Sequence, residues 1–147
     1  MAGMADNEEP VWAKIDFRQN VDDLVQYGPS LKVGISADPF VGGEMASACS
    51  QIDTGAAGTG ISTRLAERLG LVAIDHGELH HPGGDPIVAP AFKVRLYLPG
   101  AELNLEVIGL STLDPPHDVL IGRDVLASCR LVVDFSRGMV GLDIKAS

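Results

Sequence analysis

The residues with the clearest chemical meaning follow an apolar run in the first half of the chain. Residues 51–58 read Gln-Ile-Asp-Thr-Gly-Ala-Ala-Gly, so small residues come directly after Asp53 and Thr54. Small side chains leave the backbone accessible, and Gly55 can adopt conformations that a residue with a Cβ atom avoids. The pattern predicts a carboxylate at a turn that another chain can approach closely. Taken alone, the pattern more often belongs to an ordinary turn built by an Asp side chain.

A second chemically distinct stretch lies at residues 119–124, which read Val-Leu-Ile-Gly-Arg-Asp. Together, in this order and spacing, the two stretches resemble the retropepsin-like (retroviral-type) branch of the aspartic proteases. Residues 62–70, Ser-Thr-Arg-Leu-Ala-Glu-Arg-Leu-Gly, look like the helix that follows the catalytic turn in cellular and bacterial members. The resemblance covers about residues 30–145, which is most of the chain.

This resemblance implies an aspartic endopeptidase with Asp53 as the catalytic residue. The chain has one Asp-Thr-Gly motif, whereas two-lobed members have two, so the resemblance implies one lobe per chain and an active homodimer. Two facing carboxylates share one proton: one activates water as a general base, and the other donates to the peptide carbonyl. Thr54 would brace the dimer axis, Gly55 would bond to the substrate backbone, and Ala56 would border the cleft.

Residues 75–86 occupy the position of the family's flap, the hairpin that closes over a bound peptide. Gly83 and Gly84 would give its tip mobility and contact the substrate. We expect Ile87, with Val88 and Ile121, to line apolar substrate pockets. The substrate would be an extended peptide or protein segment held by strand-like hydrogen bonds.

The same segment holds the candidate metal ligands His76, Glu78, His80, His81 and Asp85. On a strand, the first three would share one face and form a permissible zinc-ligand set. Glycine-flanked histidines are more often solvated, so we expect no metal and no cofactor. A further hypothesis is that these histidines change flap closure as they titrate.

Gly122, Arg123 and Asp124 are expected to have structural roles. In retroviral members the matching Arg pairs with an acid just after the catalytic turn, but this chain has Ala57-Gly58 there. Three partners for Arg123 therefore stay open: Asp124, a backbone carbonyl, or an acid from the second chain. Asp124 is also a candidate cap for the helix that follows.

The elements that must position these residues are mainly strands. Short apolar runs between turn signals predict strands at residues 11–17, 31–36, 45–52, 86–98, 103–110, 119–121, 131–135 and 139–144. Helix signals follow Asn20, Ser62 and Gly122, the last over residues 123–130. The predicted fold is mainly β, a retropepsin-like closed β-barrel or sandwich with one or two short helices. Residues 1–10 are expected to be a flexible N-terminus, residues 11–29 an extension of one strand and a short helix, and residues 30–147 the protease domain.

Composition excludes several other classes. The 147 residues carry a formal charge of -9 without a cluster of Lys and Arg, which disfavours a nucleic-acid partner. Membrane helices need an apolar run of roughly 18 residues, and none is present. With no export signal and with Cys49 and Cys129 far apart, we expect reduced thiols and a cytoplasmic protein.

Two rival functions remain beside the endopeptidase. One is a catalytically weak or inactive retropepsin-like dimeric peptide-binding module, because fold alone does not determine activity. The other is a metal-binding β-domain that uses the His-rich segment.

Overall fold

The computed structural model describes residues 12–38, 44–79 and 83–145. Within these residues it has ten strands and three short helices, which confirms the mainly β prediction. In this part of the chain no helix is both long and apolar enough to cross a membrane. The expectations for residues 1–10 and for His80 and His81 fall outside the described residues.

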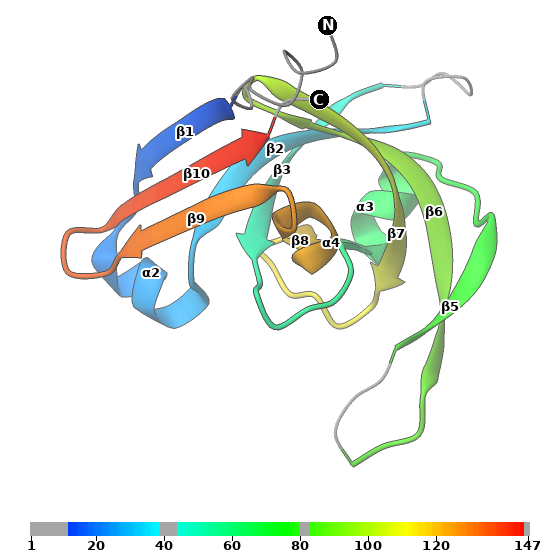
Figure 1. Ribbon diagram of the computed structural model, residues 1–147. Coiled ribbons are helices and arrows are strands. Elements are labelled where there is room, and N and C mark those ends of the chain that lie inside the picture. Colours follow the sequence, from blue (N-terminus) through cyan, green and yellow to red (C-terminus); the bar gives the residue numbers. More distant parts are fainter. Residues whose placement is uncertain (1–11, 39–43, 80–82, 146–147) are drawn as a thin grey trace, which may run out of the picture.

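Six strands form a closed barrel, shown in Figure 1. Each strand is hydrogen-bonded to the next in the order β2, β3, β8, β4, β7 and β6, and β6 pairs again with β2 to close the ring. The six are β2 (Ser30–Ala37), β3 (Ala46–Ile52), β8 (Val119–Ile121), β4 (Gly60–Ser62), β7 (Ala101–Leu110) and β6 (Ile87–Leu98). β5 (Asp75–Leu79) pairs with the first half of β6 and lies outside the ring.

The short strand β8 brings the two sequence motifs together. It lies between β3, to which it runs parallel, and β4, to which it runs antiparallel. Ile52, the last residue of β3, is opposite Ile121, the last residue of β8. Since parallel strands end at the same edge, the residues after β3 and after β8 leave the barrel side by side.

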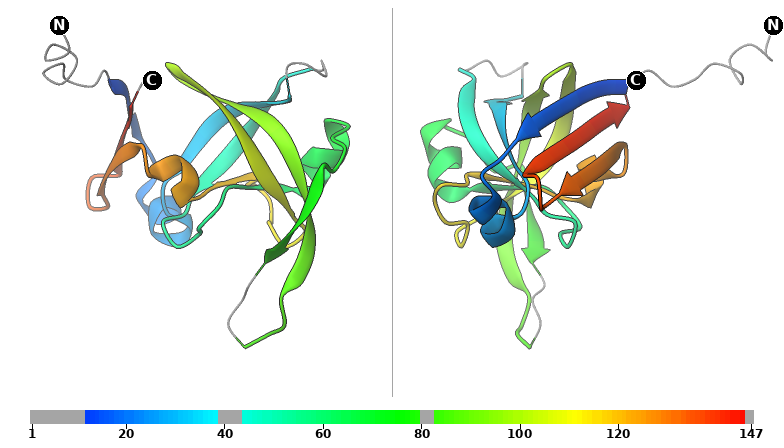
Figure 2. Two further views of the ribbon diagram at one scale, coloured as in Figure 1. Left: turned by 45° about the vertical axis from the view of Figure 1, so that its right-hand side comes forward. Right: turned by 90° about the vertical axis from the view of Figure 1, so that its left-hand side faces the viewer.

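A second, three-stranded sheet lies beside the barrel, as Figures 1 and 2 show. Its order is β1 (Trp12–Arg18), β10 (Met139–Lys145) and β9 (Cys129–Asp134), all antiparallel. Side chains of this sheet, among them Ile15 and Leu142, belong to the same hydrophobic core as the barrel. The strand near the N-terminus is therefore packed into the body of the protein.

Side-chain caps mark the start of two of the three described helices. Asn20 accepts hydrogen bonds from the backbone of Asp22 and Asp23 at the start of α2 (Val21–Tyr27). The Ser62 hydroxyl accepts from Leu65 N–H at 3.1 Å at the start of α3 (Thr63–Arg68). Both caps agree with the sequence patterns.

The third helix is shorter than its sequence suggests. α4 spans Arg123–Leu126, so the prediction of a helix to residue 130 is wrong. Cys129 instead begins β9, where it pairs with Ile144 of β10. The sheet ladder overrides the local helix preference of residues 127–130.

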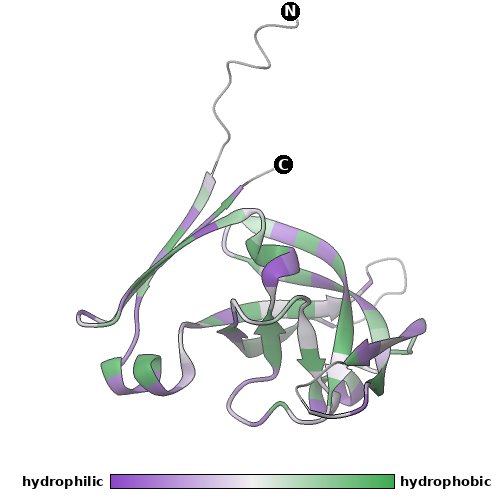
Figure 3. Ribbon diagram, turned by 60° about the horizontal axis from the view of Figure 1, so that its bottom comes forward, coloured by the Kyte–Doolittle hydropathy of each residue, from purple (hydrophilic) through white to green (hydrophobic). Residues whose placement is uncertain are grey.

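The core follows the alternation of side chains along the strands, which Figure 3 shows as bands of hydrophobic and hydrophilic colour. Ile61, Val119 and Ile121 are fully buried in it. The prediction that Ile121 lines a substrate pocket is therefore wrong, because its side chain packs inside the barrel.

Candidate functional site

The loop after β3 holds Asp53 by short hydrogen bonds. Its backbone N–H donates to Ile121 O at 2.9 Å, and its carboxylate Oδ1 accepts from Gly55 N–H at 2.8 Å. Asp53 is half-buried, while Thr54 and Gly55 are exposed. The loop therefore fixes the carboxylate next to the protein surface, where a substrate or a second chain can reach it.

The residues after β8 form the support of this loop. Arg123 N–H donates to Ala56 O at 2.8 Å, and Asp124 N–H donates to Ala57 O at 3.2 Å. A Cβ atom on Gly122 would overlap the carbonyl group of Gly58 and lie 3.0 Å from Ala56 O. Only glycine lets the two segments approach this closely.

Within the single chain, Arg123 binds one of the three partners left open for it, a backbone carbonyl. Its guanidinium Nη1 donates to the backbone carbonyl of Thr54 at 2.9 Å. Arg123 thus ties the second motif to the residue that directly follows Asp53.

Asp124 has a role that the sequence did not reveal. Its Oδ1 accepts from the Thr59 hydroxyl at 2.7 Å, and its Oδ2 accepts from Thr59 N–H at 3.1 Å. The same hydroxyl accepts from Gly122 N–H at 3.2 Å. Gly122, the N-cap residue of α4, makes no side-chain cap, but Asp124 Oδ1 also accepts from Val125 N–H at 2.8 Å in the first turn of the helix. Thr59, 2% exposed, is the site residue that sequence reasoning missed.

An apolar hollow borders the Asp53 loop. It has a volume of about 390 Å³ and is lined by Thr54, Arg123, Leu126, Ala127 and Leu131. Apolar surface next to a polar loop is typical of a surface that another chain covers.

The β5–β6 hairpin projects beyond the barrel in both views of Figure 2. Gly83 has a positive φ of 77°, a Cβ there would meet nothing within 4 Å, and both Gly83 and Gly84 are exposed. The glycines therefore occur in an open turn, as the flap interpretation requires.

Strand register assigns the hairpin residues to its two faces. His76 is opposite Pro90 and Glu78 is opposite Val88, which places them on the face of β6 that continues to the core residue Phe92. Ile87 lies on the other face, with Leu79 opposite it. For contact with a ligand on the barrel side, the register favours Val88 over Ile87.

Neither the histidines nor the cysteines form a recognisable centre in the part of the chain that the structure covers. No group of three His, Cys, Asp or Glu side chains there could hold a metal ion. Burial raises the pKa of both the Cys49 and the Cys129 thiol, which disfavours the reactive thiolate.

Comparison with known proteins rests on structure. No protein-family model matches the chain, and no curated protein is significantly similar to it in sequence. A solved retropepsin-like aspartic protease from Rickettsia conorii is similar with a TM-score of 0.58 and 18% identity, over 94% of this chain and 96% of that chain. At this identity the likeness shows a shared fold, so the retropepsin-like fold expected from the sequence is confirmed.

A second solved structure, a protein of unknown function from Legionella pneumophila, matches with a TM-score of 0.39 and 12% identity. That match covers 65% of this chain and 83% of the other, and it carries no argument.

Proposed function

We propose that the chain is a retropepsin-like aspartic endopeptidase that works as a homodimer and hydrolyses peptide bonds with a pair of Asp53 carboxylates. The observation that carries the proposal is the Asp53 loop. In this loop a half-buried carboxylate lies at the edge of the barrel and accepts a hydrogen bond from Gly55 N–H. The backbone of the loop packs closely against Gly122. In this proposal residues 30–147 are the protease domain and residues 11–29 its extension.

The need for a second copy follows from the chemistry. One carboxylate cannot serve at once as the base for water and as the acid for the carbonyl oxygen. Each chain has a single Asp-Thr-Gly motif, so the second carboxylate comes from a symmetry-related chain. The apolar hollow at Thr54, Leu126 and Leu131 supports this arrangement, because it offers contact surface beside the loop.

The proposed reaction consumes one water molecule per bond. The ionised Asp53 takes a proton from water, whose oxygen attacks the carbonyl carbon, while the protonated Asp53 of the other chain donates to the carbonyl oxygen. The C–N bond of the tetrahedral intermediate then breaks: the leaving amine takes the proton that the first Asp53 accepted from water, and one hydroxyl of the intermediate returns its proton to the other Asp53. The second product is the carboxylic acid, and the pair again holds one proton. No metal takes part.

The substrate in this proposal is an extended peptide between the Asp53 pair and the β5–β6 hairpin. Gly83 and Gly84 would let the hairpin move over it, and backbone groups of Gly55 would bond to it. Val88 is the side chain of β6 best placed to contact its apolar groups.

The test is cleavage of a diverse peptide library between about pH 4 and 7, in the range where carboxylate pairs titrate. Asp53→Asn is compared with wild type and with Asp114→Asn, which makes the same change at an exposed carboxylate away from the loop. Thermal melting and sedimentation velocity establish that each variant is folded and dimeric. We expect cleavage by wild type and Asp114→Asn, and none by Asp53→Asn.

Two outcomes contradict the proposal. Cleavage that survives in Asp53→Asn would mean that another group does the chemistry. A folded wild-type dimer that binds peptides without cutting any would point instead to the peptide-binding module.

A further inference from the structure

β9 (Cys129–Asp134) is an edge strand of the three-stranded sheet. It pairs with β10 on one side, and in the part of the chain that the structure describes no strand or loop pairs with its other side. The N–H and C=O groups of every second residue of β9 therefore point out of the sheet without a backbone partner. This edge can accept a further strand.

The composition of β9 does not protect this edge. Natural edge strands commonly carry charged residues or proline, which prevent pairing with another chain. β1, at the opposite edge of the sheet, has Lys14, Asp16 and Arg18 at alternate positions. The centre of β9 is instead Leu-Val-Val at residues 131–133, and Val132 is 68% exposed. Nothing in the sequence of β9 opposes pairing at its centre.

The face of β9 that turns toward the core is incompletely covered. Leu131 lies opposite Leu142, which is buried, yet Leu131 itself and Val133 are only half-buried. Leu131 also lines the apolar hollow beside Thr54 in the Asp53 loop. The free edge of β9 is therefore continuous with the surface at which the proposed function needs a second chain.

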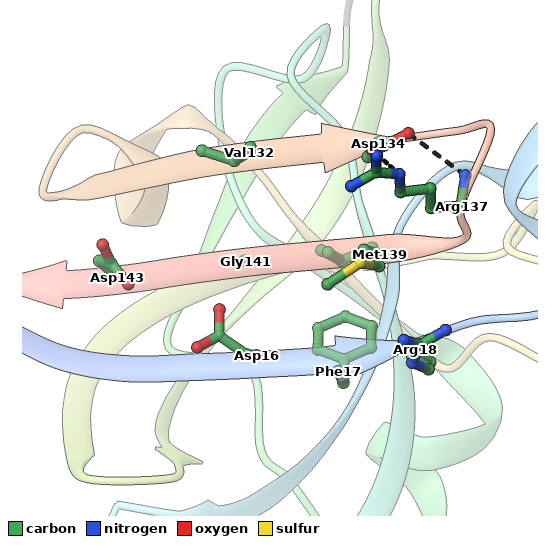
Figure 4. A pocket seen from close by; sticks show the side chains of 10 residues that line it. Asp16, Phe17, Arg18, Val132, Asp134, Arg137, Met139, Gly141 and Asp143 are labelled. Atoms are coloured by element: carbon green, nitrogen blue, oxygen red, sulfur yellow. Dashed lines mark hydrogen bonds and ion pairs between the residues drawn. The ribbon is translucent and has the colours of Figure 1, made fainter.

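The outward face of β9 is self-complementary in charge. Arg130, Val132 and Asp134 lie on this face, and Figure 4 shows the last two. If a second β9 runs antiparallel with Val132 opposite its own copy, Arg130 lies opposite the partner's Asp134 at both ends of the pairing. An isologous contact between identical chains requires this kind of reciprocity.

The other charges of the sheet fit the same register. In the joined sheet the row through Arg130 reads Lys14, Asp143, Arg130 and then the partner's Asp134, the partner's Met139 and the partner's Arg18. The signs alternate over the first four positions, the fifth is uncharged and the sixth is positive. In the central row, Asp16 of each chain lies at the far end, beyond Gly141 and Val132. Like charges therefore do not face each other across the new contact.

Both charged residues keep hydrogen-bonding groups for this contact. Arg130 stacks over the Trp12 ring at 4.0 Å from its centroid, and stacking leaves the N–H donors in the guanidinium plane available. The Ser136 hydroxyl donates to Asp134 at 2.7 Å and lowers the pKa of that carboxyl group, which is therefore ionised at neutral pH. Arg137 lies 3.7 Å from the same carboxylate. A carboxylate has about four lone-pair sites, so it can accept from a further donor.

We propose that two chains join through antiparallel pairing of their β9 edges, with Val132 on the two-fold axis and Arg130 opposite the partner's Asp134. The dimer then shares one six-stranded sheet. This inference rests on the homodimer of the proposed function and names its contact surface. The axis is perpendicular to the shared sheet, and on the inner side it passes beside Leu131, where the two Asp53 loops would meet.

The first test is disulfide cross-linking at the axis. Residues directly opposite each other in an antiparallel pair have Cα atoms about 4.5–5.5 Å apart, a separation that a disulfide spans. Val132→Cys should therefore form a covalent dimer under mild oxidation at least about tenfold faster than Val25→Cys. Val25, on α2, is also 68% exposed, so the two introduced thiols are equally accessible. Non-reducing gel electrophoresis measures the rates.

The second test exchanges the two charges. Arg130→Asp and Asp134→Arg each set like charges opposite each other twice per dimer, so each should raise the dimer dissociation constant at least about tenfold. The double variant restores both pairs in reverse and should return to within about threefold of wild type. It also lacks the contacts with Trp12 and Ser136, so contacts within one chain cannot explain its recovery.

Arg18→Asp is the matched control, because it makes the same charge change on the outward face of β1, away from the β9 edge. It should change the dissociation constant by less than about threefold. Sedimentation equilibrium measures the constants, and thermal melting establishes that each variant is folded.

None of these measurements depends on cleavage, so the interface and the protease activity are tested separately. A wild-type dimer in which Val132→Cys cross-links no faster than Val25→Cys would overturn the β9 interface alone. A double variant as weakly dimeric as the single variants would do the same, and a monomeric wild type would overturn the interface together with the homodimer. Cross-linking and charge rescue without cleavage of any peptide would support the interface and contradict the endopeptidase.

Discussion

At the level of single residues, Gly122 determines how closely the Asp53 loop packs on the strand end beneath it. We predict that Gly122→Ala lowers the free energy of unfolding by about 1–3 kcal/mol. We expect a value near the upper end of this range, because the atoms that the new methyl group would meet are backbone atoms, which cannot move aside as a side chain can. The new methyl group would overlap the carbonyl of Gly58 and displace the loop. Urea denaturation measures the free energy of unfolding, and cleavage activity should fall with it.

Gly58 supplies the matched control, since a Cβ atom there would meet nothing within 4 Å and its φ is not positive. Gly58→Ala should change stability by less than about 1 kcal/mol. If the two substitutions lower the free energy of unfolding equally, close packing over Gly122 does not stabilise the loop.

Part of this site could be predicted from the sequence and part could not. Asp53, Gly122 and Arg123 belong to short motifs whose residue types are informative on their own. Thr59 and Asp124 are 65 residues apart, and neither lies in a local pattern that predicts their hydrogen bonds. Their pairing exists only because β8 inserts beside β4.

At the level of elements, His117 joins the loop before β8 to the start of β2. It is 4% exposed, its Nε2 lies 2.9 Å from Ser30 Oγ, and its ring packs edge-on against Tyr27 at 5.4 Å. Burial lowers the pKa of His117, and the charge of Asp118 opposes this only in part. The folded protein therefore favours the neutral imidazole.

This burial makes stability depend on pH. Below about pH 6.5 His117 becomes protonated in the unfolded chain, whereas in the folded chain it stays neutral. The free energy of unfolding therefore decreases as pH falls, until the pH reaches the lower pKa that His117 has in the folded protein. We predict that His117→Gln is less stable than wild type at pH 7.5 but loses less stability between pH 7 and 5. Denaturation curves at several pH values measure the difference.

His76→Gln serves as the comparison, because His76 is exposed on the hairpin. It should keep the wild-type pH dependence. If the free energy of unfolding of His117→Gln decreases with falling pH as steeply as that of wild type, other groups cause the acid sensitivity.

Element prediction succeeded where the signal was local. The caps at Asn20 and Ser62 identified α2 and α3, and apolar runs identified eight of the ten described strands. The runs did not predict β4 or β5. It failed at the end of α4, where pairing of Cys129 with Ile144 decides the conformation. Closure of the barrel through β2 and β6 likewise depends on pairs such as Gly34 and Tyr97. These residues are too far apart in the sequence for a local pattern to predict their pairing.

At the level of the whole molecule, the proposed function ties activity to assembly. One Asp53 per chain means that specific activity should rise with protein concentration until the dimer is saturated. We predict that Arg123→Ala raises the dimer dissociation constant by about tenfold, because the hydrogen bond to Thr54 O that steadies the interface loop is lost.

Sedimentation equilibrium measures the dimer dissociation constant. Specific activity at several protein concentrations should rise with the fraction of dimer calculated from that constant. Arg68→Ala, which removes an exposed guanidinium from α3, should leave it unchanged. Unchanged dimer affinity in Arg123→Ala would remove this role from Arg123.

The insertion of β8 also bears on the synthesis of the chain. The ribosome releases β3 and β4 well before residues 119–121, so the strand edges that β8 will occupy stay unpaired for much of translation. Edges of this kind invite wrong pairing, and contacts between distant residues slow folding. The Asp53 loop gains its support from Gly122 only after most of the polypeptide has been made. A nascent chain therefore has no assembled Asp53 loop, and under the proposed function the order of synthesis would delay activity until the barrel can close.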